Sequence, residues 1–464
     1  MLSDFFWAFA LYGSFLATIS FFVYKKSSNT TEFMLGNRTL NYWATALAAH
    51  SSDMSIWLFM GLPGTVYAQG LAIAWVPIGL VAGMFLAWTF IAPTLRRATE
   101  QHNALTLSSF FEAHFHDNSG KLRTASALIC LIFFSFYISS GLVGMGTMFE
   151  NVFGINYHIG ILIALCTTVA YTFFGGFIGV AWCDLFQALF LAAMIIMVPC
   201  LAFDSIGSWQ IVSHAALLQH IPLTFIPTNM NGLFSALILA FSWGLGYFGQ
   251  PHILINFMGI NNTQEIKKAR FIGMTWQVLT LGAALAVGLL GIAFFSPALP
   301  DKELVFVAMV QHLFSPFFAG IVLCAIIAAG LTTVDTQILV AASTFTHDLY
   351  QHYFNPQATE KQQVLVSRIT MLIIAVMSYA IAWNKSTSVY GLVAYAWSGL
   401  GSSFGPTLLA SLYFSRATTK GTFYGMLAGA CISSLWPLFI TEIPAMIPGF
   451  LMNMLCIIIF FKEK

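Results

Sequence analysis

Charged residues are scarce in this sequence of 464 residues: only 8% are Asp, Glu, Lys or Arg, whereas 58% are hydrophobic. Together with a mean hydropathy of +0.82, this shortage excludes a water-soluble protein of this size. The formal net charge of +1 gives no sign of a basic surface for nucleic acid. The composition is typical of a protein that crosses a membrane many times.

Cysteine motifs and soluble modules are missing as well. The 7 cysteines fall in or beside apolar segments, with no C-x-x-C pair and no metal-type spacing, which favours reduced packing residues. No nucleophile with a nearby base and no phosphate loop stands out, which disfavours a membrane enzyme. Without a Gly/Ser linker or an appended module, the sequence predicts one transmembrane domain over 1–464.

About thirteen apolar segments reach the roughly 20 residues needed to cross a bilayer. They lie near 5–24, 41–62, 66–93, 122–149, 157–176, 180–203, 231–256, 272–296, 316–346, 366–384, 389–413, 421–440 and 445–461. The first segment lacks the basic start and cleavage site of a signal peptide, so we expect it to be retained. Two amphipathic stretches, Leu105 to His114 and Trp209 to Leu218, are expected along the membrane surface.

The basic residues test this count. With the N-terminus outside, sixteen of the 18 Lys and Arg residues fall in cytoplasmic connections, and only Lys302 and Lys385 remain outside. A single missed span would invert every later connection. The pattern therefore predicts an external N-terminus and a cytoplasmic C-terminus.

The second apolar segment is interrupted by polar residues over Ser51 to Gly64, which reads S-S-D-M-S-I-W-L-F-M-G-L-P-G. A carboxylate at mid-membrane costs about 2.5–3.5 kcal/mol, so Asp53 needs a reason to be there. We expect an unwound helix that lines an ion and solute site. Asp53 would attract the ion, cap the break by accepting backbone N–H groups, or do both.

A second interruption lies in the seventh segment. Ser242 to Pro251, S-W-G-L-G-Y-F-G-Q-P, holds three glycines and a proline, which disfavours a continuous helix. It follows the first interruption by five segments, and transporters often repeat a helix bundle in inverted orientation. The sequence therefore predicts a first helix and loop, two inverted repeats and two C-terminal helices, at 1–40, 41–203, 231–414 and 421–464.

These two stretches, together with N-A-L-T-L at Asn103 to Leu107 and A-Y-A-W-S-G-L-G-S-S-F-G-P from Ala394, resemble the sodium/solute symporter family over nearly the whole chain. The resemblance implies an all-α polytopic membrane fold with a leucine-transporter-type 5+5 inverted-repeat core. It also implies alternating access with Na⁺ as the coupling ion, no organic cofactor, and import of a small amino acid, proline first.

Sodium is dehydrated only where several oxygens replace its water, and unwound backbone and Thr hydroxyls offer such oxygens. By resemblance, the ligands are three backbone carbonyls and two adjacent hydroxyls of the ninth segment: those of Ser51, Met54 and Ala329, with Thr332 and Thr333. From the residues alone, the alternative is that the Thr hydroxyls bond the preceding helical turn.

Two further acidic residues, Asp184 and Asp335, lie within apolar segments. Thr332, Asp335 and Thr336 share one helix face by their i, i+3, i+4 spacing. In some members of the family, an acidic residue at the Asp184 position meets this face and holds a second sodium ion. Asp184, Asp335 and Thr336 are therefore candidates for a second cation or a shared proton; for Asp184, snorkelling or pairing with a basic loop residue is the alternative.

The solute pocket is expected where the two breaks meet, with half-helix N-termini facing an anionic group. By resemblance its lining consists of Ser55, Ile56, Tyr137, Trp243, Tyr247 and Pro251. As residue types, Trp and Tyr are also common in packing and at membrane interfaces. Ile56 stands where proline-transporting members of the family have glycine, so its side chain either shrinks the pocket or points away from it.

The expected protein is a Na⁺-coupled symporter in the bacterial inner membrane, in contact with lipid and without an obligate protein partner. Two alternatives stay open. One is the same fold carrying another amino acid or a monocarboxylate, and the other is a membrane sensor that binds its solute without transporting it.

Overall fold

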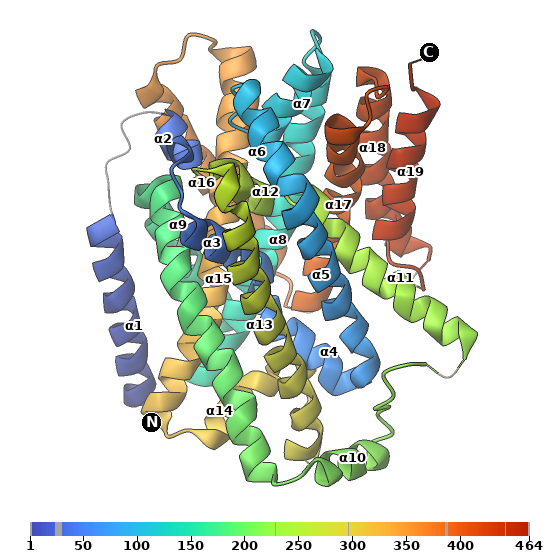
Figure 1. Cartoon of the computed structure of the whole chain (residues 1–464). Helices are drawn as coiled ribbons and strands as arrows, with labels where there is room; N and C mark the ends of the chain where they lie inside the picture. Colours follow the sequence, from blue (N-terminus) through green and yellow to red (C-terminus); the bar gives the residue numbers. More distant parts are fainter. Residues whose placement is uncertain are drawn as a thin grey trace.

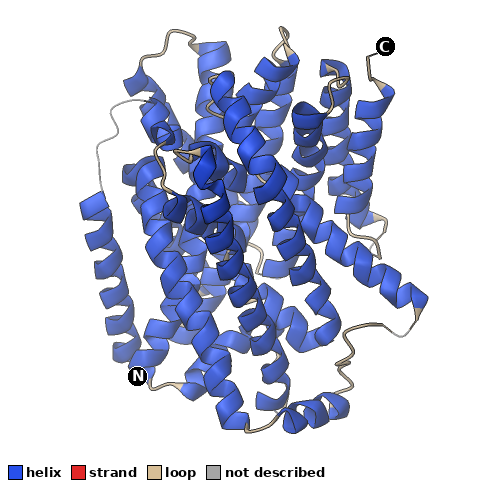
Figure 2. Ribbon diagram, viewed as in Figure 1, coloured by secondary structure: helices blue, strands red, loops and turns tan. Residues whose placement is uncertain are grey.

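The computed structural model describes residues 2–23, 30–227, 229–295, 297–385, 388–440 and 442–462. Helices make up most of this part of the chain, and the pairing of Leu40 with Ile260 is an isolated β-bridge (Figure 2). The helices form a single bundle, and α1 begins at the end of the bundle opposite to the one where α19 ends (Figure 1). The predicted all-α architecture is confirmed.

Each of the thirteen apolar segments coincides with a helix, with part of one, or with a run of consecutive helices. The segments with one helix each are α1 (Leu2–Val23), α8 (Lys121–Phe153), α13 (Ile266–Phe294), α15 (Pro316–Thr344), α16 (Glu360–Ala382), α17 (Val389–Tyr413), α18 (Thr419–Leu435) and α19 (Met446–Ile459). The others comprise α3 (Tyr42–Met54), η2 (Ile56–Leu58) and α4 (Gly61–Gln69); η3 (Leu71–Ala74), α5 (Trp75–Leu86), η4 (Ala87–Ile91) and α6 (Ala92–Gln101); α9 (Tyr157–Ile206); and α11 (Met230–Gly246), η5 (Tyr247–Gly249) and α12 (Pro251–Gly259).

Short helices occupy the connections. They are α2 (Thr30–Leu35), η1 (Gly36–Arg38), α7 (Leu107–Phe115), α10 (Trp209–Leu218), η6 (Thr263–Glu265), η7 (Lys302–Leu304), α14 (Val305–Leu313) and η8 (Phe345–Phe354). The short turn η9 (Trp436–Leu438) ends the segment predicted at 421–440. The two stretches expected at the membrane surface thus correspond to α7 and α10.

Seven helical stretches in the described ranges are long and apolar enough to cross a membrane, judged by length and composition. Three shorter helices are also apolar: Asp4–Ile19, Tyr157–Ala170 and Met446–Ile459. The chain is therefore a polytopic membrane protein, while the total of thirteen crossings and the inverted repeat remain predictions.

Helix α15 lies in the core of the bundle. Of the 18 residues that represent the apolar part of Pro316–Phe354, 83% are buried, compared with 33% for Glu360–Ala382, which is α16. It packs against α8, α9, α1 and α3. Every residue from Val322 to Thr344 on α15 is buried. A polar residue in this part of the helix is therefore surrounded by protein, and its hydrogen-bond partners must come from neighbouring residues.

The first predicted break is present. Helix α3 ends at Met54, and Ser55 follows with φ 51° and ψ −170°, a left-handed φ that is uncommon for a residue with a side chain. The Ser55 hydroxyl accepts the Trp57 N–H at 3.1 Å, so it caps the turn that follows. Local Ser and Gly residues thus end one half-helix and start the next.

The second predicted break is present as well. Helix α11 runs into the single turn η5, Gln250 is extended with φ −96° and ψ 103°, and α12 starts at Pro251. Proline suits the first position of a helix because it has no N–H to lose there. Gly249 is needed because a Cβ at this position would lie 2.5 Å from the backbone nitrogen of Gly405.

The segments predicted at 157–176 and 180–203 correspond to the two parts of α9. The junction is at Gly176, where φ is 57° and ψ is −174° inside the otherwise helical run. This is a conformation that glycine adopts easily. The run labelled α9 is therefore two helical parts that meet at Gly176, and they match the two predicted segments.

Candidate functional site

The predicted sodium oxygens come together between α3 and α15. The Thr332 hydroxyl lies 3.2 Å from the Ser51 carbonyl oxygen and 3.2 Å from that of Ala329. The Thr333 hydroxyl donates to the same Ser51 carbonyl at 3.3 Å. Four of the five predicted oxygens thus form one cluster, and the Thr332 hydroxyl bonds its own helix as well as α3.

Met54 supplies the fifth predicted carbonyl and is the last residue of α3. The final carbonyls of a helix have no partner within the helix, and they form the negative end of its dipole. The site therefore offers neutral oxygens and a partial negative charge, which suits a hard monovalent cation.

Asp53 links the two helix breaks. Its side chain is buried, and the Tyr247 hydroxyl of η5 donates to one of its carboxylate oxygens. Gln277 of α13 in turn donates its amide to the Tyr247 oxygen at 2.9 Å, and Tyr137 of α8 donates to the Asp53 carbonyl at 3.2 Å. The capping role considered for Asp53 belongs instead to Ser55.

Two of the predicted solute residues, Trp243 and Tyr247, belong to an aromatic cluster, defined here as Trp57, Trp243, Tyr247, Tyr390 and Trp397. The ring centroids of Trp57 and Trp243 are 5.1 Å apart, those of Trp243 and Tyr390 5.6 Å, and those of Tyr247 and Trp397 5.1 Å. The Trp397 indole donates to the Trp243 carbonyl at 3.1 Å. The cluster joins η2, α11, η5 and α17, so it spans both breaks.

Ile56 points away from the aromatic cluster. Its side chain is fully buried and fits between two glycines: a Cβ on Gly144 of α8 would lie 2.5 Å from Ile56 Cγ2. A Cβ on Gly330 of α15 would lie 3.0 Å from Ile56 Cδ1. The Ile56 side chain therefore packs between α8 and α15.

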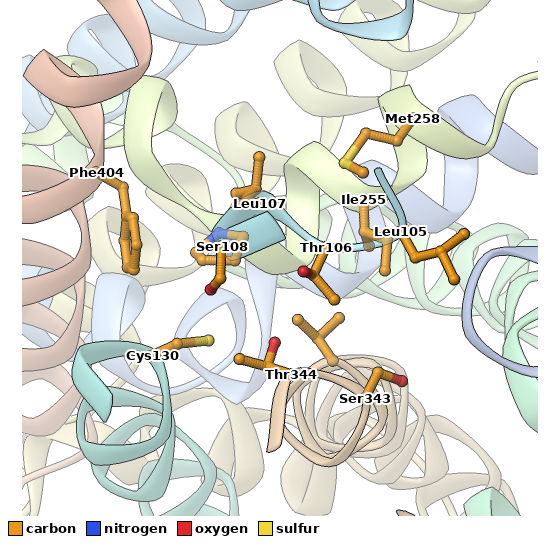
Figure 3. A pocket seen from close by; sticks show the side chains of 12 residues that line it. Leu105, Thr106, Leu107, Ser108, Cys130, Ile255, Met258, Ser343, Thr344 and Phe404 are labelled. Atoms are coloured by element: carbon orange, nitrogen blue, oxygen red, sulfur yellow. The ribbon is translucent and has the colours of Figure 1, made fainter. Parts of the chain in front are cut away.

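Pro251 lines a small cavity beyond the aromatic cluster. The cavity has a volume of about 20 Å³, enough for one water molecule. Figure 3 shows Thr106 and Leu107, at the start of α7, near Ser343 and Thr344 of α15 around this cavity. The cavity therefore lies between the second break and α7.

Asp184, Asp335 and Thr336 also come together, between α9 and α15. The Thr336 hydroxyl lies 3.3 Å from Asp184 Oδ2 and 3.4 Å from Asp335 Oδ1. Both carboxyl groups are fully buried, and Asp184 Oδ1 and Asp335 Oδ2 have no hydrogen-bond partner in the described part of the chain. Snorkelling of Asp184 to the surface is therefore wrong.

One known protein family matches the chain over most of its length. Residues 33–429 match the model of the Sodium:solute symporter family. The chain belongs to this family. It is a Na⁺-coupled transporter and an integral membrane protein, in a family of transporters rather than enzymes.

Two bacterial relatives of this symporter are similar over almost their full length. The high-affinity proline transporter PutP of Bacillus subtilis (strain 168) is 40% identical over 450 residues, which cover 95% of this chain and 94% of the relative. The sodium/proline symporter of Escherichia coli (strain K12) is 40% identical over 464 residues, which cover 97% of this chain and 91% of the relative.

Solved structures share the symporter's fold. A substrate-bound, outward-open Na⁺-coupled sialic acid symporter aligns with a TM-score of 0.83 at 14% identity, over 98% of this chain and 97% of that one. MhsT in complex with L-phenylalanine aligns with a TM-score of 0.59 at 13% identity, over 90% and 97%. These likenesses establish the leucine-transporter type of fold and nothing about the solute.

Three residues of this symporter's site, Trp57, Gln277 and Tyr390, are not among the residues predicted from the sequence. Gln277 is one of few amides within an apolar segment, and this pattern is a sequence signal for a site residue. Trp57 lies inside the first break, but no sequence pattern distinguishes it from other aromatic residues. Tyr390 is at the start of α17, far from both motifs in sequence, so only the folded chain connects it to them.

Proposed function

We propose that this symporter imports L-proline together with Na⁺ by alternating access. The observation that carries the proposal is the contact of the two breaks through Asp53 and Tyr247. Two residues earlier in α3, the Ser51 carbonyl accepts from Thr332 and Thr333. A solute held at the breaks and an ion held by these oxygens would therefore share one helix end.

Proline is favoured over other solutes by two independent points. Two relatives at 40% identity are named as proline transporters. In addition, Ile56 is seated between Gly144 and Gly330 rather than in the pocket. The departure from the family's glycine therefore gives no steric objection to proline.

The proposed sodium ligands are the carbonyls of Ser51, Met54 and Ala329 and the hydroxyls of Thr332 and Thr333. Binding of Na⁺ would replace the two hydroxyl bonds to Ser51 by coordination, with the hydroxyl hydrogens turned away. Asp53, adjacent to this end of α3, would add negative charge to the ion path. Each entering Na⁺ contributes about 2.3 kcal/mol per 100 mV of membrane potential.

The proposed solute residues are Ser55, Tyr137, Trp243, Tyr247 and Pro251. The Trp243 and Tyr247 rings would cover the apolar pyrrolidine ring, and the positive dipole ends at the starts of α4 and α12 would attract the carboxylate. No Lys or Arg lies near these side chains in the described contacts of the cluster. A zwitterion held by backbone groups fits that environment.

The proposed topology has the N-terminus outside and the C-terminus in the cytoplasm of a bacterial cell. The distribution of Lys and Arg supports it. The start of α1 and the end of α19, which lie at opposite ends of the bundle, agree with it (Figure 1). Within one transmembrane domain, 41–203 and 231–414 would form the inverted repeats, surrounded by lipid and needing no protein partner.

Uptake of labelled proline into proteoliposomes, with and without an inward Na⁺ gradient, tests the proposal. Accumulation only with the gradient is expected. Na⁺-dependent binding without accumulation would favour a sensor. Concentration of another amino acid or a monocarboxylate, with proline excluded, would overturn the choice of solute.

Replacement of Thr332 by Ala tests the sodium ligands. We expect the Na⁺ concentration for half-maximal uptake to rise roughly tenfold or more. The ion loses the Thr332 hydroxyl as a ligand, and the buried Ser51 carbonyl loses a hydrogen-bond donor. Thr167→Ala is the matched control, since Thr167 is exposed and its hydroxyl bonds only its own helix, at 2.8 Å from the Ile163 carbonyl. An equal effect of both substitutions would contradict the assignment.

A second cation at Asp184, Asp335 and Thr336 is a further candidate, supported by the two carboxylate oxygens without a partner. A proton shared by the two carboxyl groups is the other reading, since like charges this close disfavour double ionisation. The Na⁺ dependence of uptake separates them. A Hill coefficient above one that falls to one in Asp335→Ser supports the cation, whereas a coefficient of one unchanged by the substitution removes it.

A further inference from the structure

Ile56 occupies a notch between two helices, which we define by Gly144 and Met145 of α8 and Gly330 of α15. A Cβ on Gly144 would lie 2.5 Å from Ile56 Cγ2, 3.2 Å from its Cδ1 and 3.3 Å from its Cβ. A Cβ on Gly330 would lie 3.0 Å from both Ile56 Cδ1 and Met145 Sδ. A larger residue at Gly144 would therefore have to displace Ile56, and one at Gly330 would press on both Ile56 and Met145.

The two sides of this notch belong to different parts of the site. Ile56 directly follows Ser55, whose left-handed φ of 51° forms the first break. Gly330 directly follows Ala329, whose carbonyl lies 3.2 Å from the Thr332 hydroxyl. The Ile56 side chain is thus a direct apolar contact between the solute break and the sodium face of α15.

Apolar packing is a suitable link for such a position. Interiors are close-packed, so a filled notch transmits displacement, whereas a hydrogen bond can stretch or be replaced by water. The Ser55–Ile56 peptide cannot shift toward α15 without compressing Gly330, and it cannot shift away without opening a cavity. The distance from α3 to the Thr332 hydroxyl is fixed accordingly.

We propose that Ile56 is a positioning residue for the sodium site, through which the solute break sets the spacing between the carbonyls at the end of α3 and the hydroxyls of α15. The proposal rests on the proposed sodium ligands. It assigns Ile56 a role in coupling the ion to the solute rather than in contacting the solute.

Kinetics of Ile56→Ala test this role. The Na⁺ concentration for half-maximal uptake should rise roughly tenfold, because the deletion leaves a cavity beside the ion ligands. At saturating Na⁺ the KM for proline should stay within about twofold, since no solute contact is lost. Ile56→Val, which keeps most of the notch filled, should give a smaller rise.

A second substitution refills the notch. Gly330→Ala alone should weaken Na⁺ dependence, because its methyl group meets Ile56 Cδ1 and Met145 Sδ. In the double variant Ile56→Ala/Gly330→Ala, the added methyl group takes the space left by the isoleucine, and part of the Na⁺ affinity should return. Such recovery is non-additive coupling expected only for side chains in contact.

Val334→Ala is the matched control for loose packing. Val334 is a fully buried residue of α15 that packs against α8, where a Cβ on Gly141 would lie 2.6 Å from its Cγ2, and it is one helical turn away from Gly330. Its Na⁺ dependence should stay close to that of the unchanged protein. Intrinsic tryptophan fluorescence titrated with NaCl gives the same comparison without any solute, since Trp57 adjoins Ile56.

Three results would overturn the proposal: a changed proline KM at saturating Na⁺ with unchanged Na⁺ dependence, no recovery in the double variant, or an equal effect of Val334→Ala. Failure of the proposed function looks different. A protein that concentrates another solute but not proline would refute the solute, while the NaCl titration of these variants would still decide the role of Ile56.

Discussion

The two ends of the bundle are closed by different chemistry. At the end where α7 lies, cytoplasmic in the proposed topology, the closure consists of charged side chains. Arg123 of α8 donates from Nε to Asp348 of η8 at 2.9 Å and from Nη1 to Glu112 of α7 at 2.9 Å. Thr106, just before α7, donates to the same Asp348 oxygen at 2.9 Å. One guanidinium thus holds three separate elements.

At the opposite end, one contact joins a carboxylate to backbone. Glu303 of η7 accepts the N–H groups of Val389 and Tyr390, both at 3.0 Å, in the first turn of α17. An anion at a helix N-terminus complements the dipole. Next to it, a Cβ on Gly64 of α4 would lie 2.8 Å from Glu303 Cα, so the backbones touch.

The two ends differ in the interactions that would break if that end of the bundle opened. Opening the Arg123 end would separate fixed charges, and Asp348 is fully buried. Opening the Glu303 end separates a half-buried carboxylate from two N–H groups that water can replace. We expect the first end to depend on complete ion pairs and the second on close packing.

The largest effect is expected for Arg123→Gln. Removal of one partner of a buried ion pair costs about 3–5 kcal/mol, because the remaining charge is left uncompensated. Thermal unfolding of the detergent-solubilised protein should therefore shift to clearly lower temperature. Arg97→Gln is the control, since Arg97 is exposed and bonds only the Pro93 carbonyl of its own helix. Equal melting temperatures for the two variants would mean that the charged closure contributes little.

An intermediate effect is expected for Gly64→Ala. The new methyl group would meet the backbone of Lys302 and Glu303 at 2.8 to 3.0 Å, and backbone cannot turn aside as a flexible side chain does. Overpacking of this kind costs about 1–3 kcal/mol. Gly13→Ala, with nothing within 4 Å of the added carbon, should leave the melting temperature unchanged. An unchanged melting temperature for Gly64→Ala would show that the backbone of Lys302 and Glu303 can move to make room for the methyl group.

The smallest effect is expected for Glu303→Gln, and it should depend on pH. Burial raises the pKa of Glu303 above its ordinary value of 4.5, with nearby Asp301 adding to the rise and the two N–H groups opposing it. Below pH 4.5 the carboxyl is protonated in both the folded and the unfolded chain. Above it the unfolded chain loses its proton first, so this contribution to stability falls as pH rises toward the raised pKa.

Glu303→Gln should abolish this part of the pH dependence and cost about 0.5–1.5 kcal/mol, because the amide can accept only one of the two N–H bonds. Melting temperatures of the variant and the unchanged protein, followed upward from pH 4.5, give the comparison. Glu442→Gln, at an exposed position, is the control. A parallel pH profile for the Glu303 variant would assign the dependence to another group.

Much of the fold was predictable because membrane helices are recognised from short stretches of sequence. Apolar length set the segments, and the breaks followed from Ser, Gly and Pro residues within Ser51 to Gly64 and Ser242 to Pro251. The i, i+3, i+4 spacing on α15 likewise placed Thr332 and Thr336 on one face. Each of these signals acts within a few residues, so no knowledge of neighbouring helices was needed.

The sequence by itself determined the class of protein, the positions of both breaks and the helix that carries the hydroxyls. Only the tertiary structure decided which way Ile56 points, that Tyr247 rather than backbone N–H groups meets Asp53, and that Arg123 joins Asp348. The partners in the last two contacts are 194 and 225 residues apart in the chain. The physical reason is that periodicity gives a side chain's face on its own helix, whereas its partner depends on how helices pack, and that is settled by small residues such as Gly144 and Gly330 on other helices.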